Sequence, residues 1–539
     1  MLDTAPQTTD ALVLDIIRAT SIAAHWRDDT LVGVLQSSDA NGFLRRNATL
    51  LIADGAKLLR QVIHILRVAC RAAIPRRLFG IEGVGDVFLP RGNGWIGAAE
   101  LMESAIPQFG EADFPFVLGF MEDWVQLTRW GLRYPKGAES IAKLALHWLP
   151  NVKSWRSPVR DGRERLFKIL LITPLAAKAA LTQMAMTAMD DKERHHDYKE
   201  LLELMFNHFY SDALWRDMPD LAVSVAEYSL GLHLSLEQAL AAGSGYDMNA
   251  MNDAFGLGFR LSTDDYPASA YHGPFFKFLS HHPQRGLDFI LKFANRACEA
   301  YAHPSNRKRG LNSPARVAIR LTDGKTNMQF GNGRLWELYR DFTVGPDVLK
   351  SALMALERWL LDKAARGETD LPEILNYLLS QSNNIAVTAV VASVATAYPS
   401  QAGDAAFAVL TCKHLFKADL ERSVNETMNA RRVNTGIWLG VEKKLYDDER
   451  AESARLPHRQ QHLEYLAVML QTSLFRDQVW ALLDAYKAEL PKESEQDDGV
   501  KVWRFRLHNM DTRNFVEVGE AEDGRVLIQA SAPHPNFKK

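Results

Sequence analysis

Cysteine is scarce in this sequence. The 539 residues include only three, Cys70, Cys298 and Cys412, and they are far apart. An odd number of widely spaced cysteines argues against a disulfide framework and against a cysteine-ligated zinc site. Each lies in an apolar helical pattern, where cysteine acts as a small buried hydrophobe. The cysteine content therefore fits a protein of the reducing cytoplasm.

Long hydrophobic runs are also lacking. Residues 1–15 are acidic and polar, without the basic and apolar regions of a signal peptide. Residues 169–189 carry Lys178 and several hydroxyl and amide side chains, and residues 386–398 are shorter than the ~20 residues that a helix needs to span a bilayer. We therefore expect both segments to be helices buried among other helices, and we expect no membrane partner.

Neither charge sign is in large excess. The formal net charge is -3, so bulk charge does not predict a nucleic-acid partner, and any such site would have to be a local basic patch. Hydrophobic residues make up 47% and charged residues 24%, which are ordinary globular proportions. Such a chain can bury a large core, so global disorder is excluded.

Nucleotide-binding and hydrolase motifs are missing from the sequence. Residues 324–326 (GKT) resemble the end of a phosphate-binding loop, but Ile319 stands where that loop needs a glycine, and the sequence predicts a strand where the loop needs a helix. No serine lies in the G-x-S-x-G pattern of the hydrolase nucleophile. We therefore predict no catalytic residue and no bound cofactor.

Metal ligands are not predicted either. His195 and His196 are adjacent, so on a helix they point ~100° apart and do not share one ion easily. A solvated, charge-rich helix face is the interpretation that we prefer. Two glycine-rich segments, residues 80–97 and 243–267, are predicted as irregular excursions between helices, and whether they bind a ligand stays open.

What the sequence has in abundance is helical periodicity. Apolar residues recur at three- and four-residue spacing, as in residues 137–150, 283–302 and 371–381, which gives each helix one buried stripe. Proline follows many of these helices and ends them. The helices are short, their connections are brief, and no exact repeat period is visible. We therefore predict an all-α fold, an irregular α-solenoid-like array of helical repeats.

Two segments depart from this pattern and predict small β elements. Residues 316–330 alternate apolar and polar side chains around Asp323-Gly324, a strong hairpin signal. Residues 500–532 alternate again around Asp523-Gly524 and predict a small sheet. The predicted regions are an N-terminal helical region with a glycine-rich loop (1–135), helical repeats (136–303), a basic loop with a hairpin (304–333), further helical repeats (334–490) and a small β element (500–532).

One basic cluster stands out as a candidate binding site. Arg307, Lys308 and Arg309 are consecutive, and Arg316 and Arg320 follow within reach. Such clusters can contact phosphates through charge. A solvated loop without a ligand is the alternative interpretation.

Four stretches resemble the helical region of very large bacterial ATP-binding proteins, the STAND-type NTPases of antiviral defence in the AVAST group. They are residues 269–302, 334–362, 375–399 and 502–518, so the resemblance covers roughly residues 269–518. Those proteins also carry a P-loop ATPase module and an N-terminal effector, and neither is visible here. The resemblance therefore implies the target-sensing part, in which helical repeats bind a foreign protein and license NTPase-driven oligomerisation. The resemblance assigns no function to any individual residue.

Three functional interpretations follow. The first is a cytoplasmic helical-repeat sensor or scaffold of a bacterial defence protein, which recognises a protein partner such as a phage-derived protein or an NTPase subunit or domain. The second is a nucleic-acid-binding helical scaffold that uses the basic cluster. The third is an enzyme whose site is not recognisable from sequence motifs.

Overall fold

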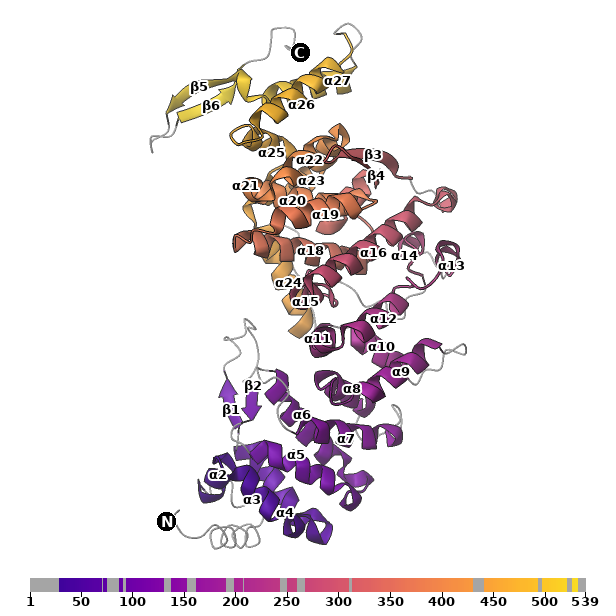
Figure 1. Ribbon diagram of the computed structural model, residues 1–539, viewed down its shortest axis with the longest axis vertical. Coiled ribbons are helices and arrows are strands. Elements are labelled where there is room, and N and C mark those ends of the chain that lie inside the picture. Colours follow the sequence, from indigo (N-terminus) through magenta and orange to yellow (C-terminus); the bar gives the residue numbers. More distant parts are fainter. Residues whose placement is uncertain are drawn as a thin grey trace. The chain divides into compact units, whose positions relative to one another are not determined.

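The chain divides into two compact units, Met1–Ser229 and Leu230–Lys539, which are described separately. The division falls inside the predicted repeat region 136–303. The computed structural model (Figure 1) describes residues 29–69, 71–74, 87–90, 94–129, 137–152, 161–190, 198–206, 208–242, 250–258, 267–309, 313–429, 441–492, 497–520 and 526–531.

The first unit is built from short helices with one pair of β-strands. Gly97 on α5 sits against α3 because its backbone N–H donates to Asn41 Oδ1 at 2.7 Å, and a Cβ atom there would lie 3.0 Å from the same oxygen. The elements are α2 (Asp29–Gln36), α3 (Ala40–Arg46), α4 (Ala48–Ala69, kinked at residues 53–56), β1 (Arg71–Ile74), β2 (Val87–Pro90), α5 (Gly94–Ser104), η2 (Ile106–Gln108), η3 (Glu111–Asp113), α6 (Phe114–Arg129), α7 (Ala138–Trp148), η4 (Leu149–Asn151), α8 (Gly162–Ile172), α9 (Lys178–Asp190), α10 (Lys199–Phe206), α11 (His208–Asp217) and α12 (Pro219–Ser229).

The second unit is also mainly helical and carries two β-hairpins. Its elements are α13 (Leu236–Ala241), α14 (Ala250–Ala254), α15 (Phe275–His281), α16 (Pro283–Ala302), η6 (Pro304–Arg309), β3 (Ala315–Arg320), β4 (Thr326–Gly331), α17 (Gly333–Glu337), η7 (Leu338–Arg340), α18 (Asp347–Ala365), α19 (Leu371–Gln381), α20 (Ile385–Ala397), α21 (Pro399–Ala402), α22 (Asp404–Leu410), α23 (Lys413–Asn429), α24 (Val441–Ala454), η8 (Pro457–Gln460), α25 (Leu463–Leu470), α26 (Arg476–Ala488), α27 (Asp498–Met510), η10 (Thr512–Asn514), β5 (Phe515–Glu520) and β6 (Val526–Ala530).

Helix α16 shows how the periodicity produces the packing. Pro283 occupies the first helical position, where a missing N–H costs nothing and the fixed φ suits a helix. The predicted stripe, which includes Leu287, Ile290, Ala294 and Tyr301, is buried. A single buried stripe on a helix favours packing on one side against neighbouring helices.

Helices of the second unit stack on helices near them in the sequence. Helix α16 contacts α18, α18 contacts α20, α20 contacts α22, α22 contacts α25, and α25 contacts α27. The same helices follow one another in Figure 1. Helix α20 lies in the middle of this stack, and its residues from Ile385 to Thr396 are all buried. The predicted all-α fold with small β elements is confirmed.

The hairpin predicted around Asp323-Gly324 is confirmed. Strands β3 and β4 pair antiparallel, with Arg320 opposite Thr326. Gly324 adopts a φ of 82°, which glycine reaches without strain, and its N–H donates to the Leu321 carbonyl oxygen at 3.0 Å. The connection is therefore a turn closed by a left-handed glycine.

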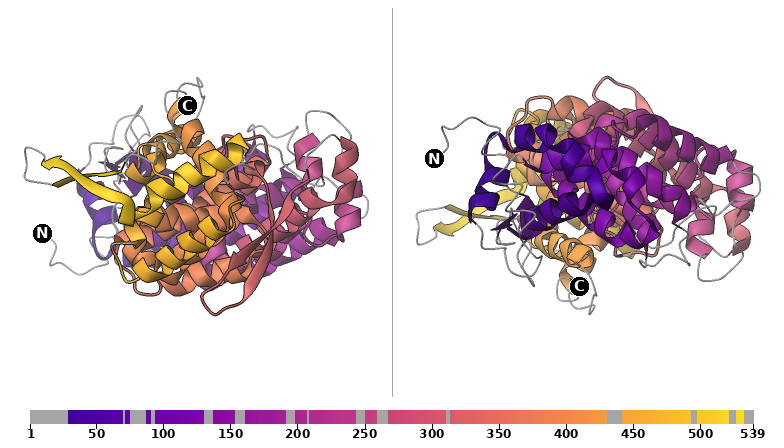
Figure 2. Two further views of the ribbon diagram at one scale, coloured as in Figure 1. Left: turned by 90° about the horizontal axis from the view of Figure 1, so that it is seen from above. Right: turned by 90° about the horizontal axis from the view of Figure 1, so that it is seen from below.

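The predicted C-terminal sheet is only partly correct. Strands β5 and β6 form an antiparallel pair that projects from the helices of the second unit (Figure 2). The first part of the predicted stretch, residues 500–510, is helical, because it belongs to α27. Asp497 caps that helix, since its side chain accepts from the Val500 N–H, and this local signal outweighs the short alternating run. The turn at Asp523-Gly524 lies outside the described residues.

The glycine-rich segment 80–97 also differs from its prediction as an irregular excursion. Residues 87–90 form β2, which pairs antiparallel with β1, and α5 begins at Gly94. Within the other glycine-rich segment, 243–267, residues 250–254 form helix α14. The remaining described residues of the two segments add no further helix or strand.

Both apolar segments are helical, as predicted, but burial is confirmed only for residues 386–398, because α9 buries only Leu181, Met184 and Ala185 and leaves Met186 56% exposed. Residues 169–189 are divided between α8 and α9, and residues 386–398 fall mostly in α20. None of the described helices has both the length and the apolar character needed to cross a membrane. Cys298 and Cys412 are buried and free, whereas Cys70 lies outside the described residues.

Candidate functional site

The β3–β4 hairpin is fixed to the helices through its inner face. The side-chain amide of Asn327 donates to the backbone carbonyl oxygens of Leu379 and Ser382, each at 2.7 Å. Gln329 is fully buried, and its side-chain oxygen accepts from the Thr388 hydroxyl at 2.6 Å. These contacts join β4 to α19 and α20, so the hairpin is held in one position.

A backbone contact adds to this anchoring. The N–H of Phe330 donates to the Asn383 carbonyl oxygen at 2.7 Å, next to a parallel bridge between Phe330 and Asn384. Asn384 is also the N-cap of α20, where its side chain accepts from the N–H groups of Ala386 and Val387. The start of the most buried helix therefore also fixes the end of β4.

The outer face of the hairpin is exposed and carries two predicted site residues. Arg316, Ala318 and Arg320 alternate with buried residues on β3, so their side chains lie on the outer face. The guanidinium of Arg316 lies 3.6 Å from the centroid of the Phe330 ring, and it donates to the Met328 carbonyl oxygen at 3.1 Å. Met328 itself is 47% exposed. The outer face thus combines cationic, aromatic and thioether groups.

The other three predicted site residues lie in a different element. Helix α16 ends at Ala302, and residues Pro304–Arg309 form the 3₁₀ helix η6 instead of the predicted loop. Asn306 fixes this turn, because its side-chain amide donates to the carbonyl oxygens of Ala254 and Ala300, each at 2.9 Å. The side chains of Arg307, Lys308 and Arg309 lie outside the described residues, whereas Arg316 and Arg320 lie on the same face of β3.

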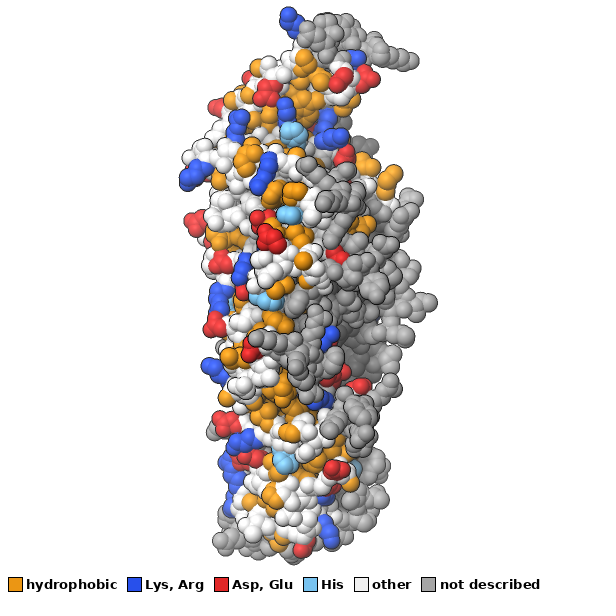
Figure 3. All heavy atoms as spheres, turned by 90° about the vertical axis from the view of Figure 1, so that its right-hand side faces the viewer, with side chains coloured by type: hydrophobic (Ala, Val, Ile, Leu, Met, Phe, Trp, Pro, Cys, Tyr) orange, Lys and Arg blue, Asp and Glu red, His pale blue; other side chains and the backbone are white. Residues whose placement is uncertain are grey.

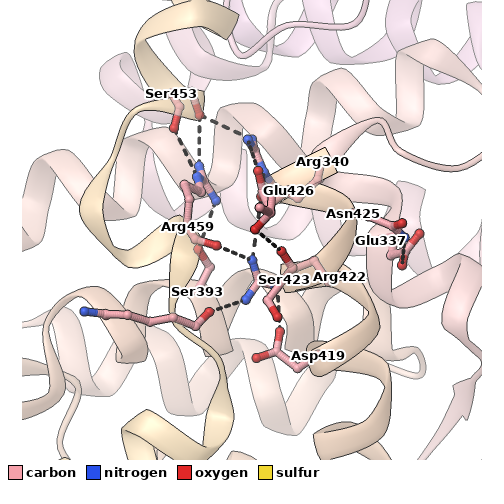
Figure 4. A network of polar contacts seen from close by, with 12 residues as sticks. Glu337, Arg340, Ser393, Asp419, Arg422, Ser423, Asn425, Glu426, Ser453 and Arg459 are labelled. Atoms are coloured by element: carbon pink, nitrogen blue, oxygen red, sulfur yellow. Dashed lines mark hydrogen bonds and ion pairs between the residues drawn. The ribbon is translucent and has the colours of Figure 1, made fainter. Parts of the chain in front are cut away.

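A buried network of ion pairs lies among the helices of the second unit (Figure 4), and it was not predicted from the sequence. It joins η7, α18, α20, α23, α24 and η8. Its charged members are three arginines and three acids, which balance one another and are each less than one tenth exposed: Arg340, Arg422, Arg459, Glu357, Asp419 and Glu426.

Arg459 and Glu357 form the most buried pair. Nη1 and Nη2 of Arg459 donate to the two Glu357 carboxylate oxygens at 2.6 and 2.7 Å, and the two side chains are 2% and 3% exposed. Two parallel hydrogen bonds of this kind are strong and directional. Ser393 on α20 donates to the same carboxylate, and Ser453 accepts from Arg459 Nη2 at 2.9 Å.

The other two pairs extend the network along α23. Nε of Arg340 donates to Glu426 at 2.6 Å, and Nε of Arg422 donates to Asp419 at 2.7 Å. Asp419 also accepts from the indole N–H of Trp336 at 3.1 Å. Trp336 lies on α17, which directly follows β4, so only a few residues of backbone separate the hairpin from a side chain that contacts the network.

Burial and charge shift the pKa values of two groups here. Burial alone would raise the pKa of the Glu357 carboxyl, but the charge and hydrogen bonds of Arg459 outweigh it and lower the pKa to about 2. Burial lowers the pKa of His458 to about 3, and the charge of the neighbouring Arg459 lowers it further in the same direction. At neutral pH the carboxyl is therefore ionised and the imidazole is neutral.

A cavity of about 230 Å³ adjoins the network. Helix α24 lines one side and faces the cavity with polar side chains. Glu449 accepts from the Ser269 hydroxyl at 2.6 Å, and Arg450 pairs with Asp341 at 2.8 Å. The lining residues are Arg340, Asp341, Phe342, Met354, Glu357, Arg358, Leu361, Glu426, Glu449, Arg450, Ser453, Ala454, Leu456 and Arg459.

The arrangement is suited to structure and binding. The Glu357 carboxylate is ionised and held by a guanidinium, so it is a poor proton donor at neutral pH. Within the described ranges, no three His, Cys, Asp or Glu side chains gather as metal ligands. His195 and His196 lie outside those ranges. The network fixes helices, and the outer face of the hairpin is the part that a partner can reach.

A sequence signal for the network exists in retrospect. Asp419, Arg422 and Glu426 are spaced so that they share one face of α23. Glu357 is a charged residue within the apolar sequence of α18, and it stands at a position that the helical periodicity predicts to be buried. Charged residues on a buried stripe indicate buried ion pairs, but the partners, which are distant in the sequence, could not be named.

Comparison with known proteins gives no match: no protein-family model fits the sequence, and no curated protein aligns with it significantly. The candidate site is therefore interpreted from its own geometry.

Proposed function

We propose that this chain is a helical-repeat scaffold that recognises a protein partner through the outer face of the β3–β4 hairpin. The observation that carries the proposal is the group formed by the exposed side chains of Arg316 and Met328 and the half-buried ring of Phe330, on a hairpin whose inner face is fixed to α19 and α20. Arginine, methionine and aromatic residues are enriched in the centres of protein interfaces.

Rigidity supports the same function. The Arg316 guanidinium is already stacked on Phe330 and bonded to a backbone carbonyl, so it loses little side-chain freedom on binding. Asn327 and Gln329 hold the opposite face. A partner therefore meets a surface that is ordered before it arrives, which favours affinity.

The resemblance to STAND-type NTPases supports a more specific form of the proposal. The hairpin lies between two of the resembling stretches, residues 269–302 and 334–362. In this form the chain is the cytoplasmic sensing region of a bacterial antiviral defence protein, and its partner is a phage-derived protein or an NTPase subunit or domain.

Affinity capture with a matched variant tests the proposal. Purified wild-type chain and an Arg316→Ala/Met328→Ala variant serve as baits in lysates of phage-infected and uninfected bacteria. We expect a protein that is enriched on wild type from infected cells and lost from the variant. Identical sets of captured proteins on both baits would contradict a role for the hairpin in partner recognition.

Nucleic-acid binding is the second candidate, because Arg316 and Arg320 share one exposed face and follow the basic residues 307–309. Figure 3 shows basic, acidic and hydrophobic side chains interspersed on one face of the chain. On the hairpin itself Met328 and Phe330 lie beside Arg316, which favours a mixed protein interface over a phosphate-binding stripe. DNA and RNA affinities at two salt concentrations decide between them, for wild type and for a variant with alanine at 307–309. A steep salt dependence that flattens in the variant would favour nucleic acid.

A further inference from the structure

The outer edge of β3 carries backbone groups that β4 does not use. The Leu321 N–H donates to the Lys325 carbonyl oxygen at 2.8 Å, which makes this pair a hydrogen-bonded one. Hydrogen-bonded and non-hydrogen-bonded pairs alternate along an antiparallel ladder. With Arg320 opposite Thr326, the N–H and C=O groups of Arg316, Ala318 and Arg320 therefore point away from β4.

Two contacts agree with this assignment. The N–H of Arg320 donates to the Thr411 hydroxyl at 3.0 Å, a group that does not belong to the hairpin. The N–H of Phe330, which is opposite Arg316, donates away from β3 to Asn383. Both residues thus belong to non-hydrogen-bonded pairs, as the alternation requires.

The edge is open at Arg316 and Ala318. Both residues are exposed. Among the described residues, no hydrogen bond to the outward backbone groups of these two is formed, whereas Arg320 is already covered by Thr411. An exposed strand edge with unsatisfied donors and acceptors is a template for another strand.

We propose that this edge binds an extended acidic segment of the protein partner as a third, antiparallel strand. The proposal rests on the proposed function and names the partner's chemistry. Backbone groups of Arg316 and Ala318 would supply the hydrogen bonds, and side chains on the outer face would supply the selectivity.

The charges of Arg316 and Arg320 determine which kind of strand can bind at this edge. A second copy of β3 that pairs antiparallel about Ala318 sets Arg316 of each copy opposite Arg320 of the other, and like charges directly opposite are destabilising. A segment that carries carboxylates near Arg316 and Arg320 is instead attracted by the two guanidinium groups. Ala318, between the two arginines, has a small side chain that leaves room for a larger one on the partner strand. The preferred segment therefore alternates, with an acidic, an apolar and a second acidic side chain on one face.

A defined peptide tests the inference. The probe is fluorescein-labelled Thr-Glu-Thr-Val-Thr-Glu-Thr. Valine pairs with Ala318 and the second glutamate with Arg316, whereas the first glutamate approaches the Arg320 side chain without a backbone pair, because Thr411 occupies the Arg320 N–H. We expect saturable binding to the full chain in fluorescence anisotropy. Hydrogen exchange should slow in the segment that contains β3 and stay unchanged in β5. The same peptide with lysine in place of both glutamates should bind at least about tenfold more weakly.

Backbone methylation separates strand addition from simple charge attraction. In the predicted register the valine N–H faces β3, and the N–H of the threonine after it points away. N-methylation of the valine should abolish binding, whereas N-methylation of that threonine should retain it. Equal effects of the two methylations would overturn the inference.

Protein variants complete the test. Ala318→Pro removes the outward N–H, and proline is tolerated at an edge where the ladder does not need that donor. Arg316→Glu/Arg320→Glu reverses the charges and keeps the outward backbone groups of β3, and Lys417→Glu is the control for charge reversal because Lys417 is 79% exposed on α23. We expect the first two variants to lose peptide binding by tenfold or more and the control to keep it. Binding that survives both hairpin variants would overturn the inference even if one of them folds poorly.

The outcomes distinguish this inference from the proposed function. If wild-type chain captures a partner and Ala318→Pro captures it equally well, strand addition is wrong and the proposed function stands. If the acidic peptide slows exchange in β3 but no partner is captured, the edge is a strand-binding site and the proposed function fails. If neither occurs, both fail.

Discussion

Replacing Glu357 with glutamine removes a negative charge from the most buried ion pair and preserves the shape of the side chain. Arg459 is then left as a cation with a 2% exposed side chain and no carboxylate opposite it. The two hydrogen bonds at 2.6 and 2.7 Å lose their ionic character. Removal of one partner of a buried pair typically costs about 3–5 kcal/mol, and we expect Glu357→Gln to lower the free energy of unfolding of the second unit by that amount.

Native-state hydrogen exchange of the full chain measures this loss of stability in the unit that contains the Glu357–Arg459 pair. Exchange of the amides of α18 reports the opening free energy of the second unit without requiring both units to unfold together. The matched control is Glu489→Gln, because Glu489 pairs with Lys413 at 3.2 Å while the two side chains are 55% and 48% exposed. An exposed pair of this kind contributes less than about 1 kcal/mol.

A double variant tests the physical reason. In Glu357→Leu/Arg459→Met both charges are removed, so no unpaired charge is left behind. The double variant should lose less stability than the sum of the losses caused by the two single replacements, and the difference should be at least about 1 kcal/mol. The reasoning is refuted if Glu357→Gln costs no more than Glu489→Gln, or if the costs of the two single replacements simply add.

Three further predictions concern other parts of the second unit. Because the pKa of His458 is lowered from 6.5 to about 3, the unfolded chain takes up its proton first; stability should fall as the pH is lowered below 6.5, and His458→Gln should flatten this slope in urea titrations. Asn306→Ala removes the buried side-chain amide that donates to carbonyl oxygens of α14 and α16 and should cost about 1–3 kcal/mol in urea denaturation, and a smaller loss would count against its anchoring role. Asn384→Ala removes the cap of α20 and should cost about 1 kcal/mol, whereas Asn384→Ser, which keeps a capping oxygen without burying a carboxylate beside the Asn295 and Asn383 side-chain oxygens, should restore part of it; equal losses would argue against capping.

The helices and the first hairpin were predictable because their signals are local. A buried stripe such as that of α16 is visible in one stretch of sequence, and Asp323-Gly324 marks its own turn. The C-terminal region shows the limit of such patterns. Residues 500–510 alternate briefly, but the Asp497 cap and the packing of α27 on α26 and α25 make them helical. Short alternating runs are ambiguous when tertiary contacts decide.

The candidate site was predictable only in part. Arg316 and Arg320 were singled out as cations, and strand periodicity places them on one face. The buried network was missed because its partners come from distant segments, as in the Arg340–Ser453 contact across 113 residues. A sequence pattern predicts that a charged side chain on an apolar stripe needs a partner, but it does not say which residue supplies the opposite charge.

The Arg459–Glu357 pair also determines how early the second unit can complete its folding while the chain is being synthesised. The two residues are 102 positions apart in the chain. At ~5–20 residues per second, roughly 5–20 s pass between the synthesis of Glu357 and that of Arg459. During this interval the Glu357 carboxylate on α18 lacks the guanidinium that forms its two hydrogen bonds, so burial of this side chain is not fully compensated. A nascent chain that stops before η8 therefore keeps its central helices exposed to chaperones and proteases, and the completed chain closes them.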